Sequence, residues 1–322
     1  NGTVALTLTT SDNGNTGAGG ALTDVDTTLI TLAPVNDAPV NTLPASFTTN
    51  EDTPLALTGL AVSDVDAGTG ALSLTLSVGA GTGGLSATAS GGVTVAGSGT
   101  ATLTLTGTQA ALNAYLASAA APVFTPAANL NGAVALTLTT SDTGNTGAGG
   151  ALTATDTSTI NVLPVDDAPV LDLDASGPGT GFSATYTENG AGVPIADTDV
   201  LIQDVDSPTL ASATVTITNG QAGDVLAAAG LPAGVSASYD AGSFTLTLSG
   251  PASLASYQAT LAAVRFASTS ENPPTLPRIV AVSVSDGQLS SAVAQATVNV
   301  VAVNDAPVNV LPASFAVSED TP

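Results

Sequence analysis

One six-residue string occurs three times in this chain with little variation. Each copy has the form Val-Asn/Asp-Asp-Ala-Pro-Val, at residues 35–40, 165–170 and 303–308. The copies begin 130 and 138 residues apart, and each interval is the size of one modest domain. A Pro restricts the backbone of each copy, and acidic residues stand just before its Ala-Pro pair. We therefore expect a series of similar domains joined at regular intervals by short, stiff, acidic linkers.

Longer repeats predict the domain boundaries. Residues 1–40 match residues 131–170 without gaps at 30 of 40 positions, and residues 309–322 are a near copy of 41–54. This arrangement of complete and partial repeats is typical of a segment from a longer tandem array. The expected segments are the C-terminal part of a type-A repeat at 1–40, a complete type-A repeat at 41–170, a complete type-B repeat at 171–308 and the start of another type-A repeat at 309–322.

Apolar residues that alternate with small or polar ones predict β-strands in both complete repeats. This two-residue period gives each strand one buried and one exposed face, as in an antiparallel sandwich. The runs include Leu103 with Leu105; Val134, Leu136 and Leu138; Phe244, Leu246 and Leu248; Val280, Val282 and Val284; and Val298 with Val300. Each repeat also has one predicted short helix, capped by Thr108 or Ser253. The apolar residues expected to face inward from these helices are Leu112, Tyr115 and Leu116 in the first, and Leu254, Tyr257 and Leu261 in the second.

Composition excludes several kinds of function. The chain has 322 residues, with 26 acidic and two basic side chains and a net charge of −24, which disfavours nucleic acid and anionic membranes as partners. It has no Cys, His or Lys, so thiolate, Ser-His-Asp and Schiff-base catalysis are ruled out, and we do not expect an enzyme. No apolar stretch reaches the roughly 18 residues of a membrane helix. The two basic residues, Arg265 and Arg278, are expected to pair with Glu271 or another acid.

Oxygen ligands are abundant, and they favour calcium or magnesium. Three sets of carboxylates recur in both repeats: the linker residues, an Asp-x-Asp pair, and an Asp that ends a strand. A Glu also recurs early in each repeat. The predicted metal ligands are Asn36, Asp37, Glu51, Asp64, Asp66, Asp142, Asp166, Asp167, Glu188, Asp204, Asp206, Asp286, Asn304 and Asp305.

Chain length suggests where these residues meet. The 14 residues from Asp37 to Glu51 and the 13 from Glu51 to Asp64 are each long enough to cross a sandwich of ~30 Å. The chain would leave a linker, place Glu51 at the far end and return with Asp64 beside the linker. Glu51 would then lie next to the following linker, at Asp166 and Asp167.

The pattern resembles cadherin-type tandem domains, and most of all the cadherin-like repeats of large bacterial surface adhesins of the RTX class, which type I secretion exports. The resemblance rests on the linkers, the Asp-x-Asp pairs, the recurring Glu, and the runs at 63–68, 126–132 and 187–195. It implies an end-to-end rod of Ig-like β-sandwiches with Ca²⁺ in the joints. It also implies an extracellular extender on a bacterial cell surface that carries a distal adhesive domain for cell adhesion or biofilm formation. The implied partners are neighbouring repeats of the same polypeptide and a host or abiotic surface bound through distal domains. The chain departs from the pattern at Asn36 and Asn304, and it has no clear Asp-Arg-Glu motif.

Three alternatives remain at this point. One repeat could itself be a module that binds glycan, protein or ice, although the absence of Trp argues against a stacking platform for sugars. Paired carboxylates could serve a glycosidase, but these acids gather at domain joints. The turns Asp12-Asn13-Gly14-Asn15 and Asp142-Thr143-Gly144-Asn145 could form local cation sites.

Overall fold

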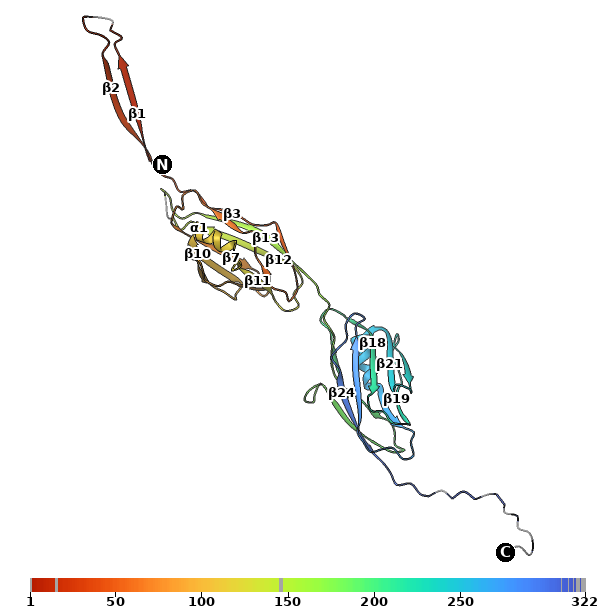
Figure 1. The fold of residues 1–322 in the computed structure, drawn as a ribbon. Coiled ribbons are helices and arrows are strands. Elements are labelled where there is room, and N and C mark those ends of the chain that lie inside the picture. The colour runs from red at the N-terminus through yellow and green to blue at the C-terminus, as the bar shows by residue number, and fades with distance from the viewer. Residues whose placement is uncertain are drawn as a thin grey trace. The chain divides into compact units, whose positions relative to one another are not determined.

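The structure is a computed structural model that describes residues 2–14, 17–144, 147–307, 309–311, 313–314, 316 and 319. The chain divides into two compact units, Asn1–Val165 (unit 1) and Asp166–Pro322 (unit 2). Both are drawn in Figure 1. The unit boundary falls inside the second copy of the linker string. Neither helix in the described part of the chain is long and apolar enough to cross a membrane.

Unit 1 contains a sandwich built from one six-stranded sheet, one three-stranded sheet and a short strand pair. The large sheet has the order β4-β13-β12-β7-β10-β9, the smaller one β5-β11-β8, and the pair is β3-β6. Their bounds are β3 (Val40–Thr42), β4 (Ser46–Asn50), β5 (Leu55–Ala56), β6 (Ala61–Ser63), β7 (Ala71–Val78), β8 (Gly83–Ser86), β9 (Thr94–Ala96), β10 (Thr102–Thr108), β11 (Val123–Pro126), β12 (Gly132–Ser141) and β13 (Thr153–Leu163).

Unit 2 repeats this topology strand for strand. Its large sheet has the order β15-β24-β23-β18-β21-β20, its smaller sheet β16-β22-β19, and its short pair is β14-β17. Their bounds are β14 (Val170–Asp172), β15 (Phe182–Thr187), β16 (Val193–Pro194), β17 (Leu201–Gln203), β18 (Thr209–Ile217), β19 (Asp224–Ala228), β20 (Ser236–Asp240), β21 (Thr245–Ser253), β22 (Val264–Ser268), β23 (Arg278–Ser285) and β24 (Ala294–Val301).

The all-β sandwich fold predicted from the alternating residues is confirmed, with one correction. The large sheets are mixed rather than purely antiparallel, because β4 pairs in parallel with β13 and β15 pairs in parallel with β24. The alternation itself holds: Val134, Leu136 and Leu138 of β12 are buried, whereas Ala135 between them is exposed. The predicted strand that contains Phe244, Leu246 and Leu248 starts one residue before β21 does. Phe244 precedes β21 with a φ of 52° and its ring packs on Gly220, where an added Cβ would lie 2.5 Å from it.

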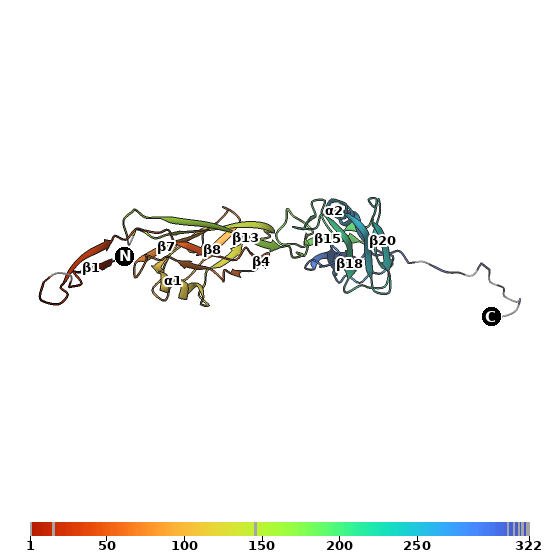
Figure 2. The same cartoon turned by 90° about the horizontal axis from the view of Figure 1, so that it is seen from above.

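Each sandwich has one short helix that follows a strand of the large sheet directly. Helix α1 (Gln109–Leu116) lies against β6 and β10, and α2 (Leu254–Ala263) lies against β17, β18 and β21. Figure 1 labels α1 and β10, and Figure 2 labels α2 and β18. The predicted caps are confirmed, since Thr108 accepts a hydrogen bond from the amide of Ala111 and Ser253 accepts one from Ser256. The inward residues are buried or packed against the core as predicted.

The two cores are mainly aliphatic, but the few aromatic residues gather in them. Tyr115 and Phe124 are buried in unit 1, and Tyr186, Tyr257 and Phe266 are buried in unit 2. Tyr186 and Phe266 meet edge to face with ring centroids 5.4 Å apart. Large rings therefore fill the centre of sandwiches that are otherwise made from Val, Leu, Ile and Ala.

Strands β1 (Gly2–Ser11) and β2 (Thr23–Leu32) form a separate antiparallel hairpin at the start of unit 1. Every residue of both strands is exposed. The segment that follows the hairpin joins the sandwich of unit 1 through a bridge between Val35 and Ala148.

Candidate metal centre

Five predicted ligands meet at the start of the unit 1 sandwich: Asn36, Asp37, Asp64, Asp66 and Asp142, here called the N-terminal cluster of unit 1. Asp64 follows β6, and its Oδ1 accepts hydrogen bonds from the amides of Asp66 and Ala67, both at 2.9 Å. This turn directs the carboxylate of Asp66 to the linker, where its Oδ2 accepts a hydrogen bond from the amide of Asp37 at 2.7 Å.

Asp142 completes this cluster from the end of β12. Its Oδ1 accepts hydrogen bonds from the amides of Gly144 and Leu152, and its Oδ2 accepts one from Nδ2 of Asn36 at 2.5 Å. Burial alone would raise the pKa of Asp142, but these hydrogen bonds outweigh it and hold the pKa below its usual 3.8. Asn36 thus acts as a hydrogen-bond donor that fixes an acidic side chain.

The corresponding cluster of unit 2 consists of Asp166, Asp167, Asp204, Asp206 and Asp286. The amide of Asp167 donates to Oδ2 of Asp206 at 3.0 Å, which repeats the contact between Asp37 and Asp66. Gln288 ties the linker to the loop after β23, because its side chain donates to Asp166 at 2.9 Å and its amide donates to Asp286 at 2.6 Å. Unit 2 has Asp166 where unit 1 has Asn36, so its cluster holds one more acid.

Carboxylates of the unit 2 cluster repel one another. Burial raises the pKa of Asp166, and the other four carboxylates of its cluster raise it further. Burial also raises the pKa of Asp204, although hydrogen bonds from neighbouring amides oppose the shift. The pKa of Asp206 is lowered instead, first by the hydrogen bond from Asp167 and then by the interaction with Asp204.

Buried oxygen atoms in these clusters have no hydrogen-bond partner. They are Oδ2 of Asp64 in unit 1, and Oδ2 of Asp166, Asp204 and Asp286 in unit 2. A buried carboxylate oxygen without a partner is costly, and a divalent cation is the kind of ligand that would satisfy several at once. The donor set, oxygen only and strongly negative, therefore fits calcium.

The recurring Glu residues lie at the C-terminal end of each unit. Glu51 and Glu188 are both only 4% exposed, and each accepts a hydrogen bond from the amide of a linker Val. Oε1 of Glu51 accepts from Val165 at 2.6 Å, and Oε2 of Glu188 accepts from Val303 at 2.7 Å. The structure thus places Glu51 against the residue that precedes Asp166, as the chain-length argument predicted.

At the end of unit 2, Glu188 is joined by Asp305 and by a residue that the sequence analysis did not select, Glu271. One oxygen of each lies within 4.8 Å of the others, and Oε1 of Glu188 is buried without a hydrogen-bond partner. We call these three residues the C-terminal cluster of unit 2. Glu271 lies in the connection between β22 and β23. Acidic residues are common in such loops, so no sequence pattern distinguishes this one as a metal ligand. Asn304 is exposed.

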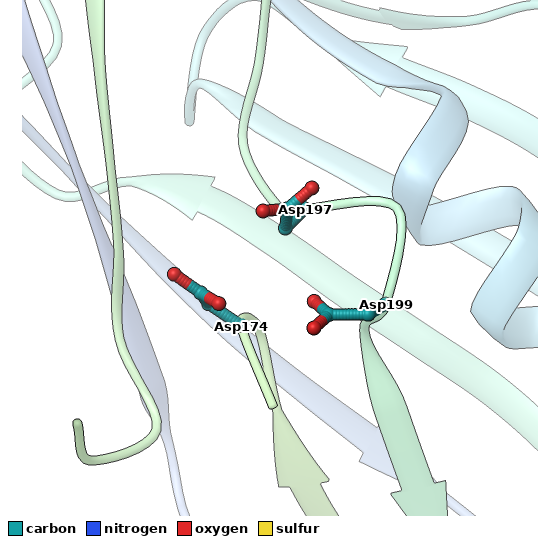
Figure 3. A group of neighbouring side chains, drawn as sticks. All are labelled: Asp174, Asp197 and Asp199. Atoms are coloured by element: carbon teal, nitrogen blue, oxygen red, sulfur yellow. The ribbon is translucent and has the colours of Figure 1, made fainter. Parts of the chain in front are cut away.

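A second group of acids was also missed: Asp174 after β14, with Asp197 and Asp199 before β17. Figure 3 shows their carboxylates turned toward one another, with one oxygen of each within 4.8 Å of the others. Asp197 accepts hydrogen bonds from Thr198, and Asp174 accepts one from Ser176. None of these three side chains has a buried oxygen without a partner.

These two groups are the only places in the described part of the chain where three carboxylates come within 4.8 Å of one another. In the N-terminal clusters, several of the acids accept hydrogen bonds from main-chain amides. At the first of the two turns considered as local cation sites, Oδ1 of Asp12 accepts hydrogen bonds from the amides of Gly14 and Leu22, and that role stays a prediction. Asn15 and Asn145 lie outside the described residues.

The arginines have different surroundings. Arg278 is fully buried and pairs with Asp224, with 2.6 Å between Nε and Oδ2, so the acid that it pairs with is not Glu271. The guanidinium of Arg265 donates to the carbonyl oxygens of Ala262 and Val264. Neither arginine neutralises the acidic clusters at the ends of the units.

No protein-family model matches this chain, and a search of curated proteins finds no match. Solved structures that are similar to it include cadherin domains 1–5 of the extracellular part of protocadherin gamma B2, with 16% identity, 94% of this chain and 46% of that one covered, and a TM-score of 0.38. Mouse cadherin-23 EC22-24 has 19% identity, covers 93% and 74%, and has a TM-score of 0.34. A bacterial structure, the C-terminal domain of the AgI/II polypeptide BspA of Streptococcus agalactiae, has 9% identity, covers 80% and 99%, and has a TM-score of 0.25. This chain thus spans less than half of the protocadherin structure.

Proposed function

We propose that this chain is an extender segment of a secreted bacterial surface adhesin, of the RTX type, in which calcium at the linkers makes tandem sandwiches rigid. In this role the segment projects a distal adhesive domain from the cell surface for cell adhesion or biofilm formation. The observation that supports it most strongly is the set of three buried carboxylate oxygens without partners at Asp166, Asp204 and Asp286. They belong to the linker and to two loops of unit 2, so a cation bound by them would tie the linker to the sandwich.

Residues on both sides of the unit boundary contribute to this proposal. Glu51 holds the last residue of unit 1, Val165, and the next residue is Asp166. We propose that Asp166, Asp167, Asp204, Asp206 and Asp286 are calcium ligands of unit 2, and that Glu51 is a calcium ligand of unit 1. The equivalent ligands at the start of unit 1 are Asn36, Asp37, Asp64, Asp66 and Asp142, and at the end of unit 2 they are Glu188, Glu271, Asn304 and Asp305.

Calcium concentration would then control the stiffness of the linkers. Extracellular modules bind calcium with dissociation constants of roughly 0.1–1 mM, so the sites would fill outside the cell and stay empty in the cytosol. An ion at 100 times its dissociation constant stabilises the state that binds it by about 2.7 kcal/mol. Without the ion, repulsion among the five acids of unit 2 opposes a fixed linker.

A catalytic role has less support. One pocket of about 310 Å³ in unit 1 is lined by Ser86, Thr88, Ser98, Val123 and several alanines, and none of these can ionise. The acidic clusters lie at the ends of the sandwiches instead.

The test is a calorimetric calcium titration of the full chain and of two matched variants. Asp204→Asn keeps the shape of the side chain but removes a charge and should weaken binding at the linker roughly tenfold. Asp240→Asn changes an acid in an exposed turn of unit 2 and should have no effect. An unchanged isotherm for Asp204→Asn, or an absence of calcium binding at millimolar concentration, would refute the proposal.

A further inference from the structure

The linker at the start of unit 1 is held by more than its acidic residues. Residues 147–150, in the loop between β12 and β13, lie against it and are here called the strap. The amide of Ala148 donates to the carbonyl oxygen of Pro34 at 2.9 Å, and the amide of Asn36 donates to the carbonyl oxygen of Ala148 at 3.2 Å. Together these hydrogen bonds make the parallel bridge between Val35 and Ala148. The strap therefore binds the backbone of the linker as a neighbouring strand would.

The side chain of Asn36 makes a second set of contacts with the same loop. Its Nδ2 donates to the carbonyl oxygen of Gly150 at 3.0 Å and to Oδ2 of Asp142 at 2.5 Å. Asn36 is 8% exposed and Asp142 is 2% exposed, so water competes little for these hydrogen bonds. Both hydrogens of the amide are used, and Oδ2 of Asp142 already has a neutral donor.

The close approach of the strap requires a glycine. Gly147 has a φ of 95°, and a Cβ added there would lie 2.5 Å from the amide nitrogen of Asn36 and 2.7 Å from the carbonyl carbon of Val35. Both are backbone atoms, and a side chain would also be strained at this φ. Gly150 has no positive φ, and no atom of the described residues, its chain neighbours aside, lies within 4 Å of a Cβ added there. Alanine at 147 should therefore push the strap off the linker, whereas alanine at 150 should not.

The corresponding loop of unit 2, all of which the structure describes, has no such strap. It has eight residues, 286–293, against the eleven of 142–152 between β12 and β13. No bridge joins it to the linker. Asp166, which stands where unit 1 has Asn36, has no side-chain donor when ionised, and it accepts a hydrogen bond from the side chain of Gln288. The remaining Oδ2 of Asp166 is buried without a hydrogen-bond partner.

We propose that the strap fixes the linker of unit 1 on its own sandwich without calcium, so that only the linker of unit 2 needs calcium to be fixed. In unit 2, the buried oxygens of Asp166, Asp204 and Asp286 lack partners until an ion binds. Type-A and type-B repeats then differ in how their linkers are held, the first by hydrogen bonds and the second by a cation. The contrast with unit 2 rests on the function proposed above, but the strap itself does not.

Hydrogen exchange of the full chain in chelator tests the strap directly. The amides of Asn36 and Ala148 should exchange roughly a hundredfold more slowly than in the unfolded chain, and Gly147→Ala should remove roughly tenfold of this protection. Gly150→Ala is the matched control and should change these rates less than about twofold. The amide of Leu138 in β12 should stay protected in both variants, which shows that unit 1 is folded. Unprotected amides in the unchanged chain, or equal effects of the two substitutions, would overturn the proposal.

A second variant changes the linker residue itself. Asn36→Asp introduces the residue that unit 2 has here, removes both side-chain donors and places a charge beside Asp142. It should speed exchange of the amide of Ala148 in chelator roughly tenfold. Asn131→Asp adds the same charge at an exposed residue at the other end of β12 and should have no effect. Unchanged exchange in Asn36→Asp would also overturn the proposal.

The same measurement in millimolar calcium separates this inference from the function proposed above. The amide of Asp167 donates to Asp206, so its exchange reports on the linker of unit 2. Calcium should slow it roughly tenfold but should change the rates of Asn36 and Ala148 less than twofold. If calcium slows none of these amides, the proposed function fails, and the chelator data alone decide on the strap. If Asn36 and Ala148 are protected only in calcium, the strap fails and the calcium function stands.

Discussion

One of the two cations of the chain lies in the core of unit 2. Nε of Arg278 donates to Asp224, and its Nη1 donates to the carbonyl oxygens of Pro274 and Leu276. Nη2 of Arg278 and Oδ1 of Asp224 are buried without partners. The pair therefore joins β23 to β19, but not every polar atom in it is satisfied.

Removal of one member of this ion pair should be costly. Arg278→Met leaves Asp224 buried and unpaired, and we expect unit 2 to lose about 3–5 kcal/mol of stability. The double variant with Asp224→Leu should recover part of this loss. Urea unfolding followed by tyrosine fluorescence measures it, because Tyr186, Tyr239 and Tyr257 lie in unit 2. Arg265→Met is the control and should change stability by less than about 1 kcal/mol. A loss as large in the control would contradict the prediction.

Protonation should affect the two N-terminal clusters in opposite directions when calcium is absent. The pKa of Asp142 is lowered in the folded state, so its stabilising effect is present above pH 3.8 and is lost as the pH falls through the folded pKa. The pKa of Asp166 is raised, so its destabilising effect is present above the folded pKa and is relieved as the pH falls toward 3.8. NMR titration of the two side-chain carboxyl groups checks this. A midpoint for Asp166 at or below that of Asp142 would show that the clusters differ in some other way.

Calcium and protons should compete for the carboxylate of Asp166. Because its pKa is raised, the side chain begins to take up protons at a higher pH than an ordinary Asp, and calcium affinity should begin to fall there. Calcium titrations at a series of pH values measure this effect. In the Asp166→Asn variant, calcium affinity should no longer begin to fall at a pH above the ordinary titration range of Asp. Retention of the full pH dependence in this variant would exclude Asp166 as its source.

At the scale of single elements, the helices show how much local sequence can specify. Both are short, and both begin at a hydroxyl residue that caps the first turn. Helices of this length are not stable alone in water, so their caps and their contacts with the sandwich have to hold them. The capping pattern was sufficient to locate both helices from the sequence.

Loss of a cap should be measurable. Thr108→Ala removes the acceptor for the amide of Ala111 and should lower the stability of unit 1 by about 1 kcal/mol. Thr108→Ser keeps the hydroxyl and should restore most of the loss. Hydrogen exchange of the amides in the first turn of α1 reports the effect directly. Equal exchange rates in the Ala and Ser variants would show that the cap contributes little.

At the scale of the whole molecule, the two units share one topology, and each carries acidic residues at both ends. The segment that joins them, residues 165–170, is short and contains Pro169, which restricts its backbone. A cation bound at such a place changes little within each sandwich, but it limits the motion of one sandwich against the next. The proposed function depends on this effect.

Spin labels attached at Thr104→Cys in unit 1 and Thr247→Cys in unit 2 should report the motion of one sandwich against the other. We expect a broad distribution of label distances in chelator and a narrow one in millimolar calcium. The double variant Glu51→Gln and Asp204→Asn should stay broad in both conditions. Asp240→Asn should behave as the unchanged chain does. Equal widths with and without calcium would mean that the linker is not stiffened by the ion.

The repeats, the sandwich strands, the capped helices and most of the acids near the ends of the units could be predicted from the order of amino acids alone. These features follow from short-range periods and turn chemistry, which neighbouring residues carry. Three contacts are visible only in the folded chain: Arg278 pairs with Asp224, Glu271 joins Glu188 and Asp305, and β4 lies parallel to β13. Each of these contacts joins residues far apart in the chain, and an isolated acid has the same local surroundings whether or not folding brings a partner to it.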